Sequence, residues 1–175
     1  VIVISSAMSG VTNELIKKTS EISDNFSDSE YDVLVSSGEQ IDCSLIAGRL
    51  IDKGYKSRSW LSWQVPIVTV GIHKNSRINQ INKNKIIKYL KEGGTPIITG
   101  FQGINNENRI TTIGRGGSDA SAIMIAKFFK AERCVIYTDV EEVYTTDPKK
   151  LNKANNITII SSDEMSFNFF IIRSP

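Results

Sequence analysis

The sequence predicts an α/β sandwich built on a mostly parallel sheet. Short apolar runs alternate along the chain with amphipathic stretches of helical spacing, the pattern of strands that are followed by helices. The length of 175 residues is that of one ordinary domain, and a hydrophobic fraction of 40% with a charged fraction of 23% is typical of a globular chain. We therefore expect a single domain over residues 1–175.

The first strand and helix come at once. The chain opens with Val-Ile-Val-Ile, so residues 1–5 are expected to be a buried strand, and residues 12–22 carry their apolar side chains at helical spacing. The run Asp-Val-Leu-Val-Ser predicts a second short strand over 32–36. A longer helix is expected over 39–53, where Gly54 provides a natural C-terminal stop.

The middle of the chain continues the alternation. Strands are expected over 58–63 and 67–70, on either side of Pro66. A short helix over 82–91 ends at a Gly-Gly pair, which favours a helix stop. The run Pro-Ile-Ile-Thr then predicts a buried strand over 96–99.

The last third begins with a hairpin, because residues 104–113 place a polar Asn-Asn-Glu-Asn turn between two apolar flanks. A helix is expected over 118–130, since its Ser-Asp start suits a helix N-terminus. Two further strands are predicted over 134–138 and 157–161.

Charge and composition exclude several classes of function. Lys and Arg exceed Asp and Glu by 21 to 19, so the net charge of +2 gives no basic footprint for nucleic acid. No apolar run approaches the roughly 18 residues that cross a bilayer. No signal peptide opens the chain, so we expect a cytoplasmic protein without nucleic-acid or membrane partners. The one histidine, His73, argues against a His-based triad or a His-rich metal site, and we interpret it as a surface loop residue.

The strongest candidate for chemistry is the run Thr-Thr-Ile-Gly-Arg-Gly-Gly-Ser-Asp over 111–119, which leads into a helix. Its three glycines let the backbone turn tightly and approach a ligand closely. The amides of the following helix N-terminus suit a phosphate or carboxylate, and Arg115 adds a bidentate clamp. The alternative is a glycine-rich turn before an ordinary N-cap.

Two other turns follow predicted strands. Ser6, Ser9 and Thr12 could hydrogen-bond a small polar ligand beyond the first strand, or could simply cap the helix. Glu39 stands near the start of the next helix, where it is either a partner of the helix dipole or a ligand for a substrate amine.

A fourth candidate is the stretch over 137–149, in which two turns bearing Thr and Asp follow a strand. From the residues alone, two simple turns and a nucleotide site are equally good interpretations. Glycine-rich turns, a clamp arginine and separate acids together favour phosphoryl transfer to a small polar acceptor, in which the protein positions reactants and neutralises charge.

Taken in order, five strings resemble the aspartate kinases of the amino-acid kinase superfamily. They lie at residues 3–13, 36–40, 100–103, 112–119 and 137–148. The resemblance implies a three-layer αβα sandwich that transfers the ATP γ-phosphate to the β-carboxylate of L-aspartate. The product would be 4-phospho-L-aspartate, the entry to lysine, threonine and methionine synthesis. Mg²⁺ would come with ATP rather than from a dedicated metal site, and the complete enzyme is expected to be a homo-oligomer.

The resemblance also implies roles for individual residues. Arg115 and Asp119 would be catalytic, Arg115 by clamping a carboxylate and Asp119 by organising the reacting groups. The aspartate site would be lined by Ser6, Thr12, Glu39, Arg115 and Ser118, with Glu39 facing the α-amino group. The nucleotide would be held by Gly116, Gly117, Thr138, Asp139, Tyr144 and Lys149.

The chain also departs from the family pattern. Lys149 stands where the family usually has arginine, residues 166–175 lose the pattern, and two phosphate-contacting lysine segments and the regulatory ACT domains are not matched. We therefore expect a partial catalytic domain that is weakly active or inactive by itself. The alternatives are a kinase for N-acetylglutamate, glutamate, carbamate or UMP, and a non-catalytic domain that binds an amino acid or a nucleotide.

Overall fold

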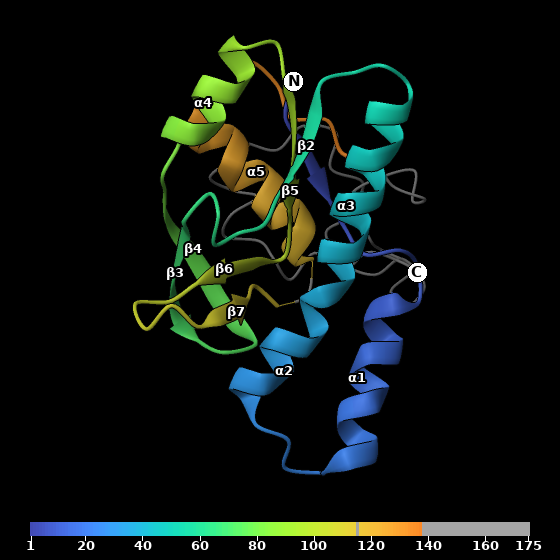
Figure 1. Ribbon diagram of the computed structural model, residues 1–175. Helices are drawn as coiled ribbons and strands as arrows, with labels where there is room; N and C mark the ends of the chain where they lie inside the picture. The colour runs from blue at the N-terminus through green and yellow to red at the C-terminus, as the bar shows by residue number, and fades with distance from the viewer. Residues whose placement is uncertain (115, 138–175) are drawn as a thin grey trace, which may run out of the picture. The chain divides into compact units, whose positions relative to one another are not determined.

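The computed structural model describes residues 1–114 and 116–137 and has a mixed α/β architecture (Figure 1). Its compact units divide at Ser121, within the last described helix. The helices are α1 (Val11–Ile22), α2 (Asp28–Val35), α3 (Ser37–Asp52), α4 (Asn84–Lys91) and α5 (Gly117–Phe129). The strands are β1 (Val3–Ser5), β2 (Ser57–Trp60), β3 (Ile67–Ile72), β4 (Asn75–Ile81), β5 (Thr95–Thr99), β6 (Gln102–Ile104) and β7 (Ile110–Thr112).

The predicted parallel sheet is present as three strands in the order β1-β5-β2. Side chains alternate between the faces of a strand, so Ile97 and Ile98 of β5 face opposite layers. Ile97 packs with Cys43 and Ala47 of α3. Ile98 is in register with Trp60, and the centres of the Trp60 ring and of the Tyr89 ring in α4 lie 5.8 Å apart. Helices therefore lie on both faces of this sheet, as the αβα expectation requires.

The second sheet has the order β4-β3-β6-β7 and contains the predicted hairpin, because β6 and β7 pair antiparallel around the polar turn. Strand β4 was not among the expected elements. Its sequence, Asn-Ser-Arg-Ile-Asn-Gln-Ile, is mostly polar, yet Ser76, Ile78 and Ile81 are buried. Ser76 is tolerated in the interior because its hydroxyl donates a hydrogen bond to the carbonyl of Thr112.

The strand predicted over 32–36 is wrong, because those residues end helix α2 and pass through Ser36 directly into α3 (Figure 1). The Val-Leu-Val run favours a strand locally. Tertiary contacts decide otherwise, since a helix brings Asp32 and Val35 to the same buried side. The expected helices over 12–22, 39–53, 82–91 and 118–130 are present with small shifts of their ends.

The two last predicted strands fare differently. Residues 134–137 have no regular secondary structure, so the strand expected over 134–138 is not seen in the part that is described. The strand expected over 157–161 lies outside the described residues. Among the described helices, none is both long and apolar enough to cross a membrane.

One buried carboxylate joins α2 to the second sheet. Asp32 is fully buried, and its oxygens accept hydrogen bonds from the Thr112 hydroxyl at 2.6 Å and from the Lys74 amide at 3.1 Å. His73 Nδ1 lies 2.6 Å from Asp32 Oδ2, so the histidine that we expected to be a surface loop residue is a structural partner of this acid. Asp28 and Lys74 add an exposed ion pair beside it.

Replacing Asp32 should therefore lower the stability of the protein strongly. Asp32→Ala leaves buried donors without an acceptor, so we expect a loss of about 3 kcal/mol in the free energy of unfolding. Asp52→Ala is the matched control, because Asp52 makes an ion pair with Arg49 in which both side chains are about two-thirds exposed. It should cost less than about 1 kcal/mol. Urea unfolding followed by circular dichroism measures both, and equal losses would contradict the role of Asp32.

Candidate active site

The candidate site is built where the parallel strands β1 and β5 end. Ser5 and Thr99, their last residues, are in register. The amide of Gly100 donates to the Ser5 carbonyl at 3.0 Å, and the Ser5 hydroxyl donates to the carbonyl of Glu39 at 3.2 Å. The ends of both strands are thus joined to the first turn of α3. In open α/β sheets ligands bind beyond this edge.

Two glycines allow the backbone segments at this edge to approach each other. A Cβ on Gly38 would lie 2.9 Å from the Cβ of Ala7, in the loop after β1. A Cβ on Gly100 would lie 2.8 Å from the Ser5 carbonyl oxygen and 3.1 Å from the Cα of Ser118. Any larger residue would push apart the β1 loop, the end of β5 and the start of α5. The predicted motifs therefore meet in space because glycine stands at these two positions.

The glycine-rich turn predicted from the sequence is present after β7. Gly114 and Gly116 have φ angles of 76° and 70°, in the left-handed region where glycine is favoured. The Gly117 amide donates to the Gly114 carbonyl at 3.1 Å, and α5 begins directly after this contact. The first turn of α5 thus follows the glycine-rich turn directly, and the amides of a helix N-terminus suit an anionic group.

Phe101 contacts this turn and itself has an uncommon backbone conformation. Its φ angle is 63°, which costs a residue with a side chain some conformational free energy. Its amide donates to the Ser121 hydroxyl at 2.9 Å, and its carbonyl accepts from the Ile113 amide at 2.9 Å. A Cβ on Gly117 would lie 2.6 Å from the Phe101 ring. Phe101 therefore connects the end of β5 to both sides of the glycine-rich turn.

Glu39 is the chemically most distinctive residue of the site. It is 3% exposed, and its Oε1 accepts a hydrogen bond from the Ala7 amide at 3.3 Å. Its Oε2 is buried and has no hydrogen-bond partner among the described residues. The pKa of Glu39 is raised from 4.5 to about 7, mainly by burial and also by the charge of Asp42. Hydrogen bonds to the Glu39 and Ala7 amides act in the opposite direction. A buried acidic oxygen without a donor fits a ligand that carries N–H groups, above all an ammonium.

A second acid lies on the same helix. Asp42 is buried one turn after Glu39, and burial raises its pKa while the Met8 amide lowers it. The loop after β1 thus supplies backbone amides to both acids of α3. Met8 itself is half exposed, whereas both acids are buried.

The other predicted residues fall around this edge. Ser6 is exposed in the β1 loop, and Thr12 is half-buried in the first turn of α1. Ser118 and Asp119 are half-buried in the first turn of α5, with Ser118 against Gly100. The predicted residues outside the described part of the chain are Arg115, Thr138, Asp139, Tyr144 and Lys149.

Sequence reasoning assigned no role to two buried residues at this edge. Thr99 is fully buried, and its Oγ1 has no hydrogen-bond partner among the described residues. Gln102, also fully buried, donates to the Ser36 carbonyl at 2.9 Å and accepts from Gln40 at 3.3 Å. Gln102 therefore ties β6 to the junction of α2 and α3. The signal in the sequence that could have indicated this role is a glutamine at the start of a short strand that is otherwise apolar.

Comparisons with known proteins follow the same pattern. Residues 1–167 match the model of the amino acid kinase family. The chain is 48% identical over 168 residues to an aspartokinase of Rickettsia conorii, covering 94% of this chain and 42% of the relative. It is 46% identical over 165 residues to an aspartokinase of Geobacillus stearothermophilus, covering 94% of this chain and 40% of the relative. The chain thus spans about two-fifths of the length of these relatives.

Solved structures agree in fold. The structure is similar to E. coli aspartokinase III in complex with aspartate and ADP, with a TM-score of 0.75, 24% identity, and coverage of 89% of this chain and 46% of that chain. It is also similar to aspartate kinase from Synechocystis, with a TM-score of 0.65, 35% identity, and coverage of 88% and 25%. An isopentenyl phosphate kinase shares the fold at a TM-score of 0.56 and 23% identity, with coverage of 79% of this chain and 53% of that chain.

The raised pKa of Glu39 predicts a particular dependence of stability on pH. Between its ordinary value of 4.5 and about 7 the folded protein holds a proton that the unfolded chain has released. Stability from this group is therefore complete below pH 4.5, falls as the pH rises and is lost above about 7. The total loss is about 3 kcal/mol.

Urea unfolding of the wild type and of Glu39→Gln between pH 5 and 8 measures this slope. The variant should flatten it, because glutamine does not titrate. Glu14→Gln, at an exposed position of α1, should keep the wild-type slope. A Glu39→Gln variant with the slope of the wild type would show that Glu39 is not the titrating group.

Proposed function

Since the chain belongs to the amino acid kinase family, we propose that the protein carrying it is an aspartate kinase. It transfers the γ-phosphate of ATP to the β-carboxylate of L-aspartate and forms 4-phospho-L-aspartate, the first step towards lysine, threonine and methionine. The names of the relatives that match 94% of the chain support this substrate. The observation that carries the proposal is the unpartnered oxygen of Glu39 at the edge where β1 and β5 end.

The proposed partner of Glu39 is the α-ammonium group of L-aspartate. An ammonium has three donors and no acceptor, so it can satisfy Oε2 and neutralise the carboxylate at the same time. A bound cation also favours the ionised form of Glu39 and lowers its pKa from the raised value of the free protein. Ser6 and Thr12 line the same pocket in this proposal, and both belong to the segment that runs from β1 into α1.

The carboxylates of the substrate belong at the glycine-rich turn. Arg115 clamps one of them, and Ser118, which packs against Gly100, orients the other towards the transferred phosphate. The attacking β-carboxylate is already ionised at neutral pH and needs no general base. The chain therefore acts by positioning two anions close together and by supplying donors to the charge that develops between them.

The nucleotide is held on the other side of the turn. We assign it to Gly116 and Gly117 and, beyond the described residues, to Thr138, Asp139, Tyr144 and Lys149. Lys149 supplies a point charge in place of the fork of an arginine, so we expect it to orient phosphate less strictly.

Mg²⁺ would accompany ATP, whose phosphates it neutralises. Mg²⁺ usually binds through substrate phosphates and one or two carboxylates and keeps several waters. Asp119, in the first turn of α5, offers a carboxylate of that kind. Within residues 1–114 and 116–137, no group of three or more His, Cys, Asp and Glu side chains is arranged to hold a metal ion. In this proposal Asp119 organises the reacting groups around the ion that ATP brings.

We further propose a cytoplasmic homo-oligomer that has neither nucleic-acid nor membrane partners. An assay of ADP release tests the activity. The protein carrying this chain is offered L-aspartate, N-acetylglutamate, glutamate, carbamate and UMP with Mg-ATP. We expect turnover with L-aspartate alone. Turnover of another acceptor without turnover of L-aspartate would overturn the assignment.

The contact between Glu39 and the substrate amine predicts proton release on binding. At pH 6.5 free Glu39 is largely protonated, because its pKa is about 7, and an ammonium ligand should displace that proton. Titration calorimetry of L-aspartate in buffers of different ionisation enthalpy counts the protons released. We expect release by the wild type and by Glu14→Gln, and none by Glu39→Gln. At pH 8 Glu39→Gln should bind about 10- to 100-fold more weakly, the range for losing a charged hydrogen bond. Equal proton release by wild type and Glu39→Gln would contradict the contact.

The clamp role of Arg115 has its own test. Arg115→Ala should raise the KM for L-aspartate at least tenfold and leave the melting temperature nearly unchanged. Arg115→Lys keeps the charge and loses the bidentate geometry, so its KM should lie between those of the wild type and Arg115→Ala. A KM for Arg115→Ala equal to that of the wild type would refute the clamp.

A further inference from the structure

A second candidate binding site lies beside α4. A cavity of about 220 Å³ is lined by Arg58, Trp60, Lys88, Tyr89 and Glu92. A second cavity of about 380 Å³ shares Lys88 and Glu92 with it and adds Lys91. We call the two together the α4 groove. None of these residues belongs to the candidate active site, so the groove needs an explanation of its own.

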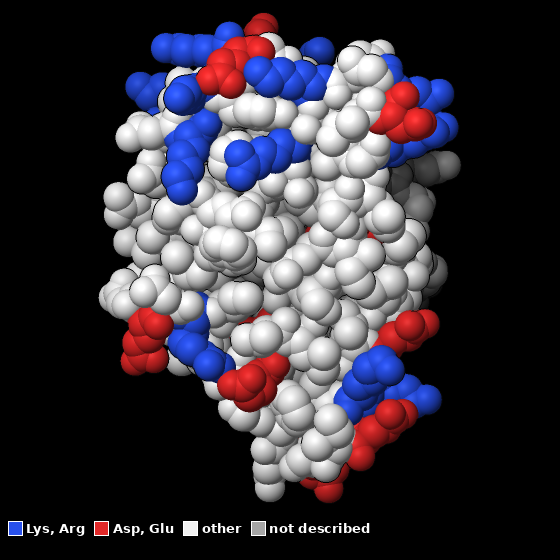
Figure 2. Space-filling model, viewed as in Figure 1, with Lys and Arg blue, Asp and Glu red and all other residues white. Residues whose placement is uncertain are grey.

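The groove is positively charged. Among the described residues, the charged groups of Arg58, Lys88 and Lys91 make neither an ion pair nor a side-chain hydrogen bond. The one acid that lines the groove, Glu92, is already paired, since Lys56 Nζ lies 3.3 Å from its carboxylate. Lys and Arg side chains gather over α4 in Figure 2. Three cations therefore face the groove without a counter-charge.

Helix polarity explains only part of this charge. Lys88 and Lys91 lie in the last turn of α4, where cations complement the helix dipole. Arg58 comes from β2 and has no such reason to be there. Its guanidinium carbon lies 4.1 Å from the centre of the Trp60 ring, so the aromatic wall holds the group in place. An arginine held on a ring keeps N–H groups available for an oxyanion.

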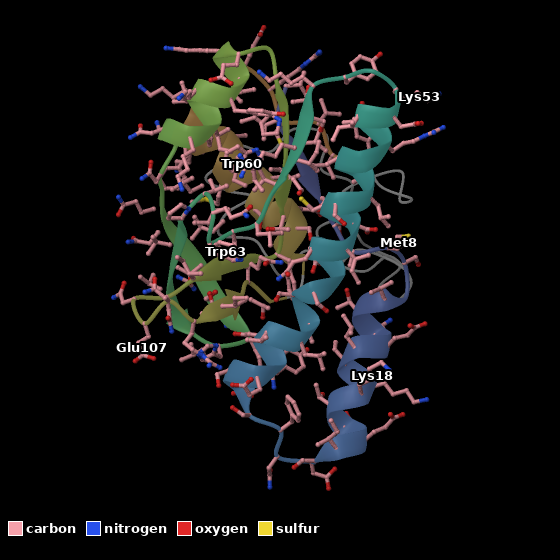
Figure 3. All side chains as sticks on the ribbon, in the orientation of Figure 1. Met8, Lys18, Lys53, Trp60, Trp63 and Glu107 are labelled. Atoms are coloured by element: carbon pink, nitrogen blue, oxygen red, sulfur yellow. The ribbon has the colours of Figure 1, made fainter. Side chains whose placement is uncertain are left out.

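Trp60 lines the groove and has an unsatisfied donor. Trp60, labelled in Figure 3, is the last residue of β2 and is 5% exposed. Its ring meets the Tyr89 ring of α4 edge-on, with an angle of 66° between the ring planes. Its Nε1 is buried and has no hydrogen-bond acceptor among the described residues. A buried N–H without an acceptor is costly, and buried polar groups usually have a partner. Because this N–H has no accessible surface, Trp60 contributes its ring to the groove, which combines cations with an aromatic wall, and the one carboxylate of the groove is occupied by Lys56.

We propose that the α4 groove binds a small molecule through an oxyanionic group, a phosphate or a cluster of carboxylates. The oxyanion lies between the Arg58 guanidinium and the Lys88 ammonium, beside the Trp60 ring that holds Arg58. Lys91 extends the positive field along the helix towards the second cavity. This ligand is separate from the proposed substrates, since the groove and the candidate active site share no residue.

The tryptophans provide a direct reporter. The chain has two tryptophans, Trp60 and Trp63, so a Trp63→Phe background leaves Trp60 as its single tryptophan. This protein is titrated with pyrophosphate and, separately, with citrate, while sodium chloride keeps the ionic strength constant. We expect a saturable change of Trp60 fluorescence. Saturation by pyrophosphate alone identifies a phosphate site, and saturation by both anions identifies a general oxyanion site.

Matched variants locate the binding. Arg58→Gln and Lys88→Gln should each weaken binding at least tenfold. Lys53→Gln is the control, because Lys53 lies at the end of α3, away from α4 in the view of Figure 3, and it should bind as the wild type does. Thermal melts of all variants separate lost binding from lost folding, and the exposed Lys88 gives a variant that should fold even if Arg58→Gln does not.

Three results would overturn the proposal. The first is the absence of a saturable change with either anion. The second is an equal change with sodium chloride alone, which would indicate screening rather than a site. The third is wild-type affinity in folded Arg58→Gln and Lys88→Gln, which would place the anion elsewhere, including in the proposed nucleotide site.

Discussion

The described structure depends on one buried carboxylate. Asp32 accepts hydrogen bonds from the turn between β3 and β4 and from Thr112 at the end of β7, and it thereby fixes helix α2 to the second sheet. The glycine-rich turn begins two residues after Thr112, and a Cβ on Gly114 would lie 3.2 Å from the Lys74 carbonyl. The turn proposed to receive the substrate is therefore held by a contact between segments distant in sequence. Without Asp32, the buried Thr112 hydroxyl and the half-buried Lys74 amide would lose their acceptor.

Glu39 illustrates the opposite situation, a buried acid that the fold leaves incompletely satisfied. Its burial raises its pKa to about 7, and Oε2 lacks a donor within the described residues. This arrangement costs stability at neutral pH, and the proposed ammonium ligand would offset that cost. Gly38 and Gly100 make it possible, because they let the β1 loop and the end of β5 close around the first turn of α3.

The fold by itself does not choose the phosphate acceptor. An isopentenyl phosphate kinase shares it at a TM-score of 0.56, and that enzyme is named for a different substrate. In the proposed function, the choice lies in the side chains at the edge of the sheet, above all in Glu39. The α4 groove is a separate feature of the same unit of the fold. It arises because β2 brings Arg58 and Trp60 against the last turn of α4, a juxtaposition unrelated to the proposed transfer of phosphate.

The sequence by itself determined the features that depend on neighbouring residues. Helices α1 and α3, the stop at Gly54, the hairpin of β6 and β7, and the glycine-rich turn all follow from local spacing and backbone preference. Glu39 was singled out because it follows a predicted strand and turn, but the structure has α2 and the first turn of α3 there. Tertiary structure decided α2, β4 and the partner of His73. In each case the deciding contact joins residues far apart in the chain, such as Asp32 with Thr112 and Ser76 with Thr112. Local propensity cannot register such pairs, because their hydrogen bonds exist only once the chain has folded.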